Sequence, residues 1–304
     1  MHRVVVWGAS GLAGGELLRL LAGHPSFEPV GAVSRKRAGQ PIWHVHPHLR
    51  SSLPELAFMS PEEALGLDVE LAFLALPHGT SGSVIESYRS RGVRVVDLSA
   101  DVRLRDASAA QRWYGAPLVG EGLRSEAVYG LPELHREELR GASLASGVGC
   151  NATAANLALF PLARAGVLQE ARLECRVGSS EAGSSPSEGS HHPFRSRALR
   201  IVEPFRHRHL AEVSQELDMA EDALSMTVTA AEMVRGVQMM ARVTFREPLR
   251  EADLWKIYRK AFRGEPFLSL CPARPKHLRF PDPRLVLGSN QVLVGFALEA
   301  DGRT

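Results

Sequence analysis

Short runs of β-branched and apolar residues alternate with helical patterns along the first 145 positions of the chain. A short apolar run predicts a buried strand, and apolar residues that recur every three or four positions predict an amphipathic helix. We expect strands at Arg3–Trp7, Pro29–Val33, Val69–Leu76 and Val93–Leu98, and helices at Leu12–Ala22 and Ser81–Ser90. Strands that alternate with helices predict an α/β fold with a Rossmann-type, doubly wound parallel sheet.

The pattern changes after Ala145, where a glycine-rich break leads into an Ala/Leu-rich segment that predicts a helix at Asn151–Ala165. A polar segment rich in Ser, Gly, His and Arg follows at Ser179–Arg208, and a further helix is expected at Glu251–Phe262. Longer strands are expected at Arg172–Ser179, Met226–Ala231, Met239–Phe245 and Val292–Leu298. Fewer crossovers and longer strands predict an α+β second domain with a mostly antiparallel sheet. We therefore expect domains at residues 1–149 and 150–304.

Composition narrows the class of protein. A chain of 304 residues is long enough for two domains with large cores. Its 36 Lys and Arg residues nearly balance 34 Asp and Glu residues, so the net charge of +2 gives no reason to expect nucleic-acid binding. The 44% hydrophobic content argues against disorder, and no apolar run approaches the roughly 18 residues of a membrane span. Because the N-terminus enters a strand directly, without a signal-peptide pattern, we expect a cytoplasmic protein.

A glycine-rich motif, Gly8-Ala-Ser-Gly11-Leu-Ala-Gly14, follows the first expected strand and opens the first expected helix. Glycines there allow a tight turn and the close approach of a pyrophosphate to backbone N–H groups. The spacing differs from the familiar G-x-G-x-x-G, and any strand-to-helix turn can use glycines. With a strand, a helix and a second strand in place, the motif predicts dinucleotide binding.

The end of the second expected strand bears on which dinucleotide is bound. A site that prefers NAD usually has a carboxylate there, which accepts from the ribose hydroxyls. This chain has Ser34, Arg35 and Lys36 instead. A hydroxyl and two cations suit a 2′-phosphate, so we expect NADP; the other interpretation is a solvated basic loop.

Cys150 lies between a glycine-rich turn and the start of an expected helix. The helix dipole favours a thiolate at that place, and nearby N–H groups are suited to hold an oxyanion. The alternative is a small buried cysteine without chemistry. Cys175 and Cys271 are interpreted as structural. The spacing of the three cysteines argues against a disulfide framework or a cysteine zinc site.

Histidines gather in two places. The segment from His191 to His209 carries five arginines and only one glutamate. This excess of positive charge would repel a metal ion and suits the binding of an anion. A histidine there can exchange protons near neutral pH, although a polar surface loop remains an alternative. The second place holds His44, His46 and His48, and we interpret it as a loop after the second strand. We expect no metal at either place.

Together these features suit the reduction of an acyl phosphate through a cysteine thioester. The chain resembles the N-acetyl-γ-glutamyl-phosphate reductase family over nearly its whole length. The matching stretches are GASGLAGGELLRLL, LALPHG, DLSADVRL, YGLPEL, GCNAT, HRHLAEV and RFPDPRLVLGSNQ. Asn151 and Ala152 after the cysteine, with SSPSEGSHHP, are similar to the branch whose substrates are attached to LysW, a small acidic carrier protein.

The resemblance implies NADPH-dependent reduction of carrier-bound α-aminoadipate 6-phosphate in lysine biosynthesis, with some relatives reducing the glutamyl phosphate for arginine. Cys150 would be the nucleophile and His209 the acid/base. The remaining implied roles fall into three groups. The pyrophosphate would be bound at Ser10, Gly11, Leu12 and Ala13, the 2′-phosphate at Ser34, Arg35 and Lys36, and the substrate at His207, Arg208, Arg103, His191 and His192. A homodimer or homotetramer is expected.

Several alternatives stay open. The same chemistry on free N-acetylglutamyl phosphate is disfavoured by Asn151 and Ala152, together with the segment that holds His191 and His192. Aspartate-semialdehyde dehydrogenase shares the architecture but fits the HRH motif poorly, and a non-catalytic NADP-binding sensor would leave the Cys150 thiol unreactive. Relatives continue past a strand like Val292–Leu298 into a C-terminal segment that returns to the nucleotide domain. We expect that segment to be missing here, which puts full activity in question, and the preference for aminoadipyl over glutamyl substrate stays undecided.

Overall fold

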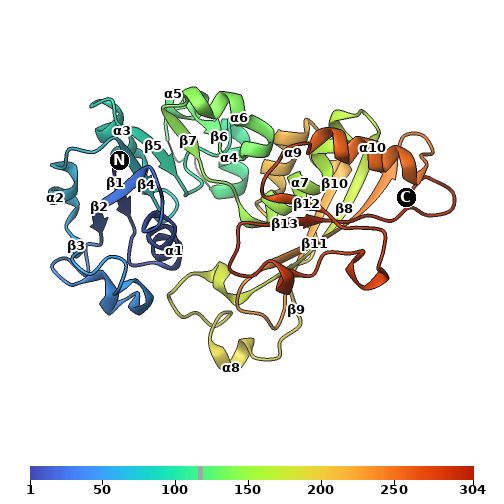
Figure 1. Ribbon diagram of the computed structural model, residues 1–304. Coiled ribbons are helices and arrows are strands. Elements are labelled where there is room, and N and C mark those ends of the chain that lie inside the picture. Colours follow the sequence, from blue (N-terminus) through green and yellow to red (C-terminus); the bar gives the residue numbers. More distant parts are fainter. Residues whose placement is uncertain (116–118) are drawn as a thin grey trace. The chain divides into compact units, whose positions relative to one another are not determined.

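The computed structural model describes residues 1–115 and 119–304, which divide into two compact units, Met1–Val148 and Gly149–Thr304 (Figure 1). The first unit contains a seven-stranded sheet in the order β3-β2-β1-β4-β5-β7-β6, and every pairing in it is parallel. Its strands are β1 His2–Trp7, β2 Phe27–Val33, β3 Phe58–Met59, β4 Leu71–Leu74, β5 Arg94–Asp97, β6 Val128–Tyr129 and β7 Leu144–Ser146. The predicted doubly wound parallel sheet is confirmed.

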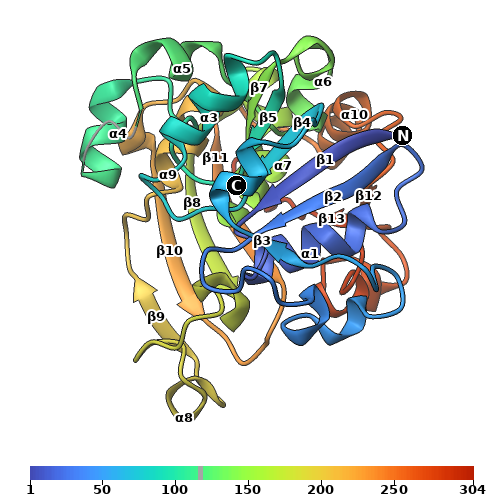
Figure 2. The ribbon, with the colours of Figure 1, turned by 90° about the vertical axis from the view of Figure 1, so that its left-hand side faces the viewer.

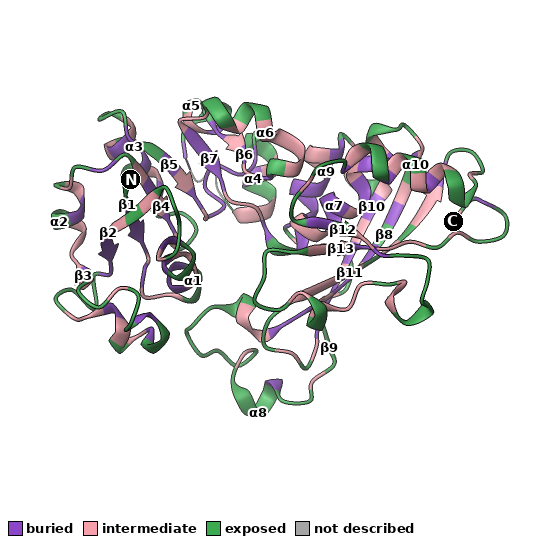
Figure 3. Ribbon diagram, in the orientation of Figure 1, coloured by how far each residue is buried: buried purple, intermediate pink, exposed green. Residues whose placement is uncertain are grey.

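Helices and short 3₁₀ turns connect these strands: α1 Leu12–Leu21, α2 Pro61–Leu65, α3 Gly82–Arg89, α4 Ala107–Tyr114, α5 Glu121–Glu126, α6 Pro132–Gly141, η1 Ile42–His44 and η2 Pro47–Leu49. Residues of β1 alternate between two apolar clusters. Val4 and Val6 pack with Leu18 of α1, whereas Val5 and Trp7 pack with the cluster that includes residues of α3. Both faces of the sheet are therefore covered, as a buried parallel sheet requires (Figure 3).

The position of β1 in the sheet determines where a ligand can bind. β1 pairs with β2 on one side and with β4 on the other, so the strand order reverses direction between β1 and β4 (Figure 2). Ligands of open parallel sheets bind beyond the carboxyl ends of the strands at such a switch point. The glycine-rich motif lies there, directly after β1.

The second unit contains a four-stranded sheet in the order β11-β8-β10-β9 and a two-stranded sheet, β12-β13. Its strands are β8 Leu168–Val177, β9 Arg200–Glu203, β10 Leu224–Ala230, β11 Val237–Phe245, β12 Leu268–Leu270 and β13 Val292–Val294. The outer pairings of the larger sheet are antiparallel, as predicted, but β8 pairs with β10 in parallel, as does β12 with β13. The four-stranded sheet is therefore mixed. The polar segment and α9 separate β8 from β10 in the sequence, and the two strands run side by side in the same direction.

Helices of this unit are α7 Cys150–Arg164, α8 His192–Arg195, α9 Leu210–Leu217 and α10 Glu251–Ala261, with 3₁₀ turns η3 Ser179–Ala182, η4 Glu221–Ala223, η5 Lys276–Leu278 and η6 Pro283–Leu285. α7 packs against β8 and β11 and against α9 and α10. Its burial continues around much of the helix, so it forms the centre of the unit. Within the described residues, no helix combines the length and the hydropathy needed to cross a membrane.

Candidate active site

The glycine-rich loop of the first unit requires glycine at two of its three motif positions. Gly8 has φ +68°, and a Cβ there would lie 2.0 Å from the Ala75 carbonyl oxygen. A Cβ at Gly14 would lie 2.4 Å from the carbonyl oxygen of Gly8. Gly11 caps α1 and donates its N–H to the Gly8 carbonyl, 3.0 Å away. The loop therefore meets the requirements of a dinucleotide site: a tight turn, then close packing of the helix N-terminus on the strand.

Two serines link this loop to the end of β2. The hydroxyls of Ser10 and Ser34 lie 2.8 Å apart, and Ser34 is buried. Arg35 and Lys36 follow and are exposed, and no ion pair involves either of them within the described residues. Two cations without carboxylate partners therefore lie beside a hydroxyl at the position where dinucleotide sites distinguish the adenosine ribose.

Arg103 lies in the first unit and is 5% exposed. Its Nε donates to the Gly147 carbonyl at 3.0 Å, and a terminal nitrogen donates to the Leu98 carbonyl at 3.3 Å. These bonds hold the backbone of the segment that leads to the cysteine. Arg103 thus links two main-chain segments, a role that its sequence position did not indicate.

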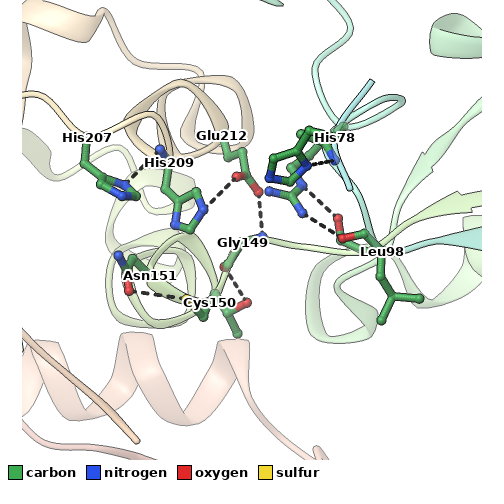
Figure 4. A network of polar contacts seen from close by, with 12 residues as sticks. His78, Leu98, Gly149, Cys150, Asn151, His207, His209 and Glu212 are labelled. Atoms are coloured by element: carbon green, nitrogen blue, oxygen red, sulfur yellow. Dashed lines mark hydrogen bonds and ion pairs between the residues drawn. The ribbon is translucent and has the colours of Figure 1, made fainter. Parts of the chain in front are cut away.

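In the second unit, Cys150 is the first residue of α7 and is exposed (Figure 4). Its Sγ lies 3.5 Å from the Oδ1 atom of Asn151, whose side chain is fully buried. The other two cysteines are buried, and burial raises the pKa of each thiol, with the charge of Cys150 adding to the effect at Cys175. Only Cys150 combines exposure with a helix N-terminus, which favours a thiolate.

His209 and Glu212 of the α9 region pack around Gly149, the residue directly before Cys150 (Figure 4). Glu212 is fully buried; its Oε2 accepts the Gly149 N–H at 2.9 Å, and its Oε1 lies 4.0 Å from Nε2 of His209. A Cβ at Gly149 would lie 2.6 Å from both side chains. Sequence reasoning missed Glu212, although its spacing of three residues from His209 places both on one helix face.

His207 lies against His209, with ring centroids 4.5 Å apart, and its Nδ1 accepts the His209 backbone N–H at 3.2 Å. Burial, and then the nearby charge of Arg208, lowers the pKa of His207 to about 4. The ring is therefore neutral near pH 7, and its proton resides on Nε2 because Nδ1 is an acceptor. Arg208 is exposed, and its charge also acts on Glu181.

His191 and His192 lie elsewhere in the second unit, at the start of α8. Both are exposed, and within the described residues neither hydrogen-bonds or stacks with Cys150, His207 or His209. Figures 1 and 2 both place α8 at the end of an arm that extends from the sheet. The described residues also contain no group of three or more His, Cys, Asp or Glu side chains that could hold a metal ion.

Known proteins share both the sequence and the fold. The family model described as the NAD binding domain of semialdehyde dehydrogenase matches residues 3–142, and its dimerisation domain matches residues 150–304. A LysW-L-2-aminoadipate/LysW-L-glutamate phosphate reductase of Sulfolobus acidocaldarius is 42% identical over 307 residues, covering 98% of this chain and 87% of the relative. A relative with the same name in Sulfurisphaera tokodaii is 41% identical over 304 residues, covering 98% of this chain and 86% of that relative.

Among solved structures, aspartate semialdehyde dehydrogenase II of Vibrio cholerae in complex with ASA aligns with a TM-score of 0.69. The alignment covers 96% of this chain and 87% of that one at 14% identity, so it shows the fold alone. The resemblance indicated by the motifs is confirmed by the relatives that share more than two fifths of the sequence over nearly the whole chain. The chain therefore belongs to the semialdehyde dehydrogenase family of NAD(P)-binding oxidoreductases.

Proposed function

We propose that the chain catalyses the NADPH-dependent reduction of L-2-aminoadipate 6-phosphate, attached to an acidic LysW-type carrier protein, to the semialdehyde. The names of its relatives support the substrate. The observation that carries the chemistry is the packing of His209 and Glu212 around Gly149, beside the exposed thiol of Cys150. In this proposal an acid/base, the residue that positions it and a nucleophile surround the start of one helix.

Cys150 acts as the nucleophile. Its thiolate attacks the acyl carbon, the bond from that carbon to the phosphate oxygen breaks, and a thioester forms. His209 accepts the thiol proton and passes it to the departing phosphate. The N–H groups in the first turn of α7 point along the helix axis toward the nucleophile and are suited to stabilise the negative oxygen that develops on the acyl group. NADPH, when bound, supplies the hydride that converts the thioester into the aldehyde and restores the thiolate.

Glu212 is a positioning residue in this scheme. Its carboxylate holds the Gly149 N–H with one oxygen and faces the His209 imidazole with the other. Because the carboxylate is fully buried, its hydrogen bond to the backbone is shielded from water. The backbone directly before Cys150 and the imidazole of His209 are thereby fixed relative to each other, as near-attack geometry requires.

NADP, rather than NAD, is the proposed cofactor. The residues that would bind the pyrophosphate are Ser10, Gly11, Leu12 and Ala13, at the N-terminus of α1. Ser34, Arg35 and Lys36 would bind the adenosine 2′-phosphate, because a hydroxyl and two cations stand where a carboxylate is usual, and neither cation has an ion-pair partner among residues 1–115 and 119–304.

The proposed partner is an acidic carrier that presents the acyl phosphate. His207 and Arg208 contact the substrate in this proposal, and the exposed arginines between His191 and His209 attract the carrier. Opposite charge steers encounter and weakens with salt, so association independent of ionic strength would remove this part of the proposal. The match to a dimerisation domain supports a homo-oligomer, which we propose to be a dimer or a tetramer.

The same chemistry on the glutamyl phosphate is the second candidate, because the names of both relatives include glutamate as well as aminoadipate. The two substrates differ by one methylene, which changes binding in an apolar pocket by only about 1–3 kcal/mol. A chain of this family therefore has little physical basis for rejecting either one completely.

Oxidation of the aldehyde in the presence of phosphate and NADP tests the proposal in the reverse direction. Three aldehydes are compared: carrier-linked aminoadipate semialdehyde, carrier-linked glutamate semialdehyde and free N-acetylglutamate semialdehyde. We expect turnover with the first, weaker or equal turnover with the second, and none with the third. Activity on the free compound alone would refute the carrier-dependent function while leaving the cysteine chemistry in place.

A further inference from the structure

His46 belongs to the histidine segment after β2, to which the proposed function assigns no role. It precedes η2 and is 7% exposed. Its Nε2 lies 2.8 Å from the carbonyl oxygen of Ala9, which stands between Gly8 and Ser10 in the glycine-rich loop. A buried side chain distant in sequence is thus bonded directly to the loop proposed to bind the pyrophosphate.

The chemistry of this bond fixes the state of the ring. A carbonyl oxygen only accepts, so Nε2 of His46 must carry the proton. Burial lowers the pKa of His46, and the nearby His48 lowers it further, whereas the bond to Ala9 acts in the opposite direction. The ring is consequently a neutral imidazole that donates from Nε2 near neutral pH.

Gly15 explains how the ring reaches the loop. It follows the G-x-x-G-x-x-G motif and has no place in that motif. A Cβ at Gly15 would lie 2.3 Å from Cε1 and 2.5 Å from Nδ1 of His46. The missing side chain therefore makes room for the imidazole against the first turn of α1.

The orientation of one peptide follows from these contacts. In a trans peptide the carbonyl and the next N–H point in opposite directions, so fixing the Ala9 carbonyl also fixes the Ser10 N–H. Within the described residues, no acceptor is found for the Ser10 N–H. We propose that His46 and Gly15 act together as a positioning pair that aims the Ser10 N–H at the pyrophosphate of the dinucleotide. This inference rests on the proposed cofactor binding and adds residues to it.

The dissociation constant of NADPH for the full chain, followed by cofactor fluorescence, tests the inference. His46→Leu removes the donor, His46→Gln keeps an N–H at a similar reach, and His48→Gln changes the exposed neighbour as a control. We expect the Kd of NADPH to rise about tenfold for His46→Leu, which is the effect of losing one hydrogen bond. For the other two variants we expect the Kd to rise by less than about threefold. The kcat at saturating NADPH should stay near the wild-type value in all three.

A Kd for His46→Leu equal to that of the wild type would overturn the inference, as would equal losses in His46→Leu and His46→Gln. Gly15→Ala, which displaces the ring without removing it, should weaken NADPH binding by a similar factor. The double variant His46→Leu/Gly15→Ala should then bind NADPH no more weakly than either single variant, because both substitutions remove the same contact. Additive losses would refute the coupling. A wild-type chain that fails to bind NADPH and NADH would instead refute the proposed function.

Discussion

The two units assemble their chemistry in different ways. In the first unit the proposed binding groups are mostly backbone N–H groups, and the sequence supplies glycines that would let a ligand approach them closely. In the second unit they are side chains brought together from distant positions: the bond between Gly149 and Glu212 joins residues 63 positions apart. A short contiguous motif can encode the first kind of site, whereas the second exists only once the fold has formed.

This contrast predicts a division of kinetic effects. Substitutions in the second unit should lower kcat and leave NADPH affinity unchanged, because they affect the nucleophile and its acid/base. Substitutions in the first unit should weaken NADPH binding and leave kcat at saturation unchanged. A residue that violates this division would show that the two units do not act as separate binding and catalytic parts.

Cys150→Ala should produce the largest effect. Removing the nucleophile prevents thioester formation, so we expect kcat to fall by at least about 10³-fold. NADPH binding, measured by fluorescence, should remain as in the wild type. Cys271→Ala is the matched control, since that thiol is buried and its pKa is raised, and it should retain turnover. Comparable turnover in both cysteine variants would contradict the assigned nucleophile.

Gly149→Ala should give the next largest loss. The new Cβ would lie 2.6 Å from both His209 and Glu212, so the turn or the two side chains must shift. A misplacement of about 1 Å can cost roughly 10²-fold in rate, and we expect a loss of that size in kcat. Gly141→Ala provides the control, because a Cβ there meets nothing within 4 Å. Normal steady-state kinetics in Gly149→Ala would show that this packing has no role in catalysis.

Sequence reasoning succeeded where one local pattern determines the structure. The long elements, such as α1, α7 and β8, were placed to within a few residues because their apolar periodicity extends over ten residues or more. The glycine-rich loop was recognised because its spacing alone specifies a turn before a helix. Short elements such as β3 and β6, with two residues each, were missed because so few positions show no period.

The candidate site was predictable only in part, for a related reason. Cys150 and His209 stand in motifs of their own, but nothing in a linear motif shows that Glu212 is buried against Gly149. Arg103 was predicted to contact the substrate from its position in DLSADVRL, and the motif gave no sign that its guanidinium also donates to two main-chain carbonyls. His191 and His192 were grouped with the substrate residues, and only the fold shows that they lie at the start of α8. Proximity in the sequence therefore does not show which side chains contact one another in the fold.

Glu212→Gln tests the part of the site that only the fold reveals. Glutamine can still accept the Gly149 N–H but has no charge to face the imidazole of His209. We expect kcat to fall by about tenfold, with KM for the acyl phosphate little changed and with an altered pH profile. Glu216→Gln, one turn further along α9, should leave the profile as in the wild type. An unchanged pH profile in Glu212→Gln would limit the residue to a purely structural role.

Replacing both Arg35 and Lys36 by alanine tests the nucleotide preference of the first unit. If they bind the 2′-phosphate, the Kd of NADPH should rise by about tenfold, an effect expected for two exposed charge-assisted contacts. The Kd of NADH, which lacks that phosphate, should not change and so provides an internal control. Equal effects on the two cofactors would indicate a general electrostatic contribution instead of recognition of the 2′-phosphate.

A last prediction concerns stability, and not activity or affinity, in the second unit. The pKa of His207 falls from 6.5 to about 4 on folding, so between these values the unfolded chain binds the proton more readily. The stability that depends on neutral His207 is therefore complete above pH 6.5 and is lost as pH falls toward 4. His207→Asn keeps an acceptor for the His209 N–H without a titrating ring. Urea midpoints measured from pH 7.5 to 4.5 should decline less steeply for this variant, and parallel declines would show that His207 stays protonatable in the folded protein.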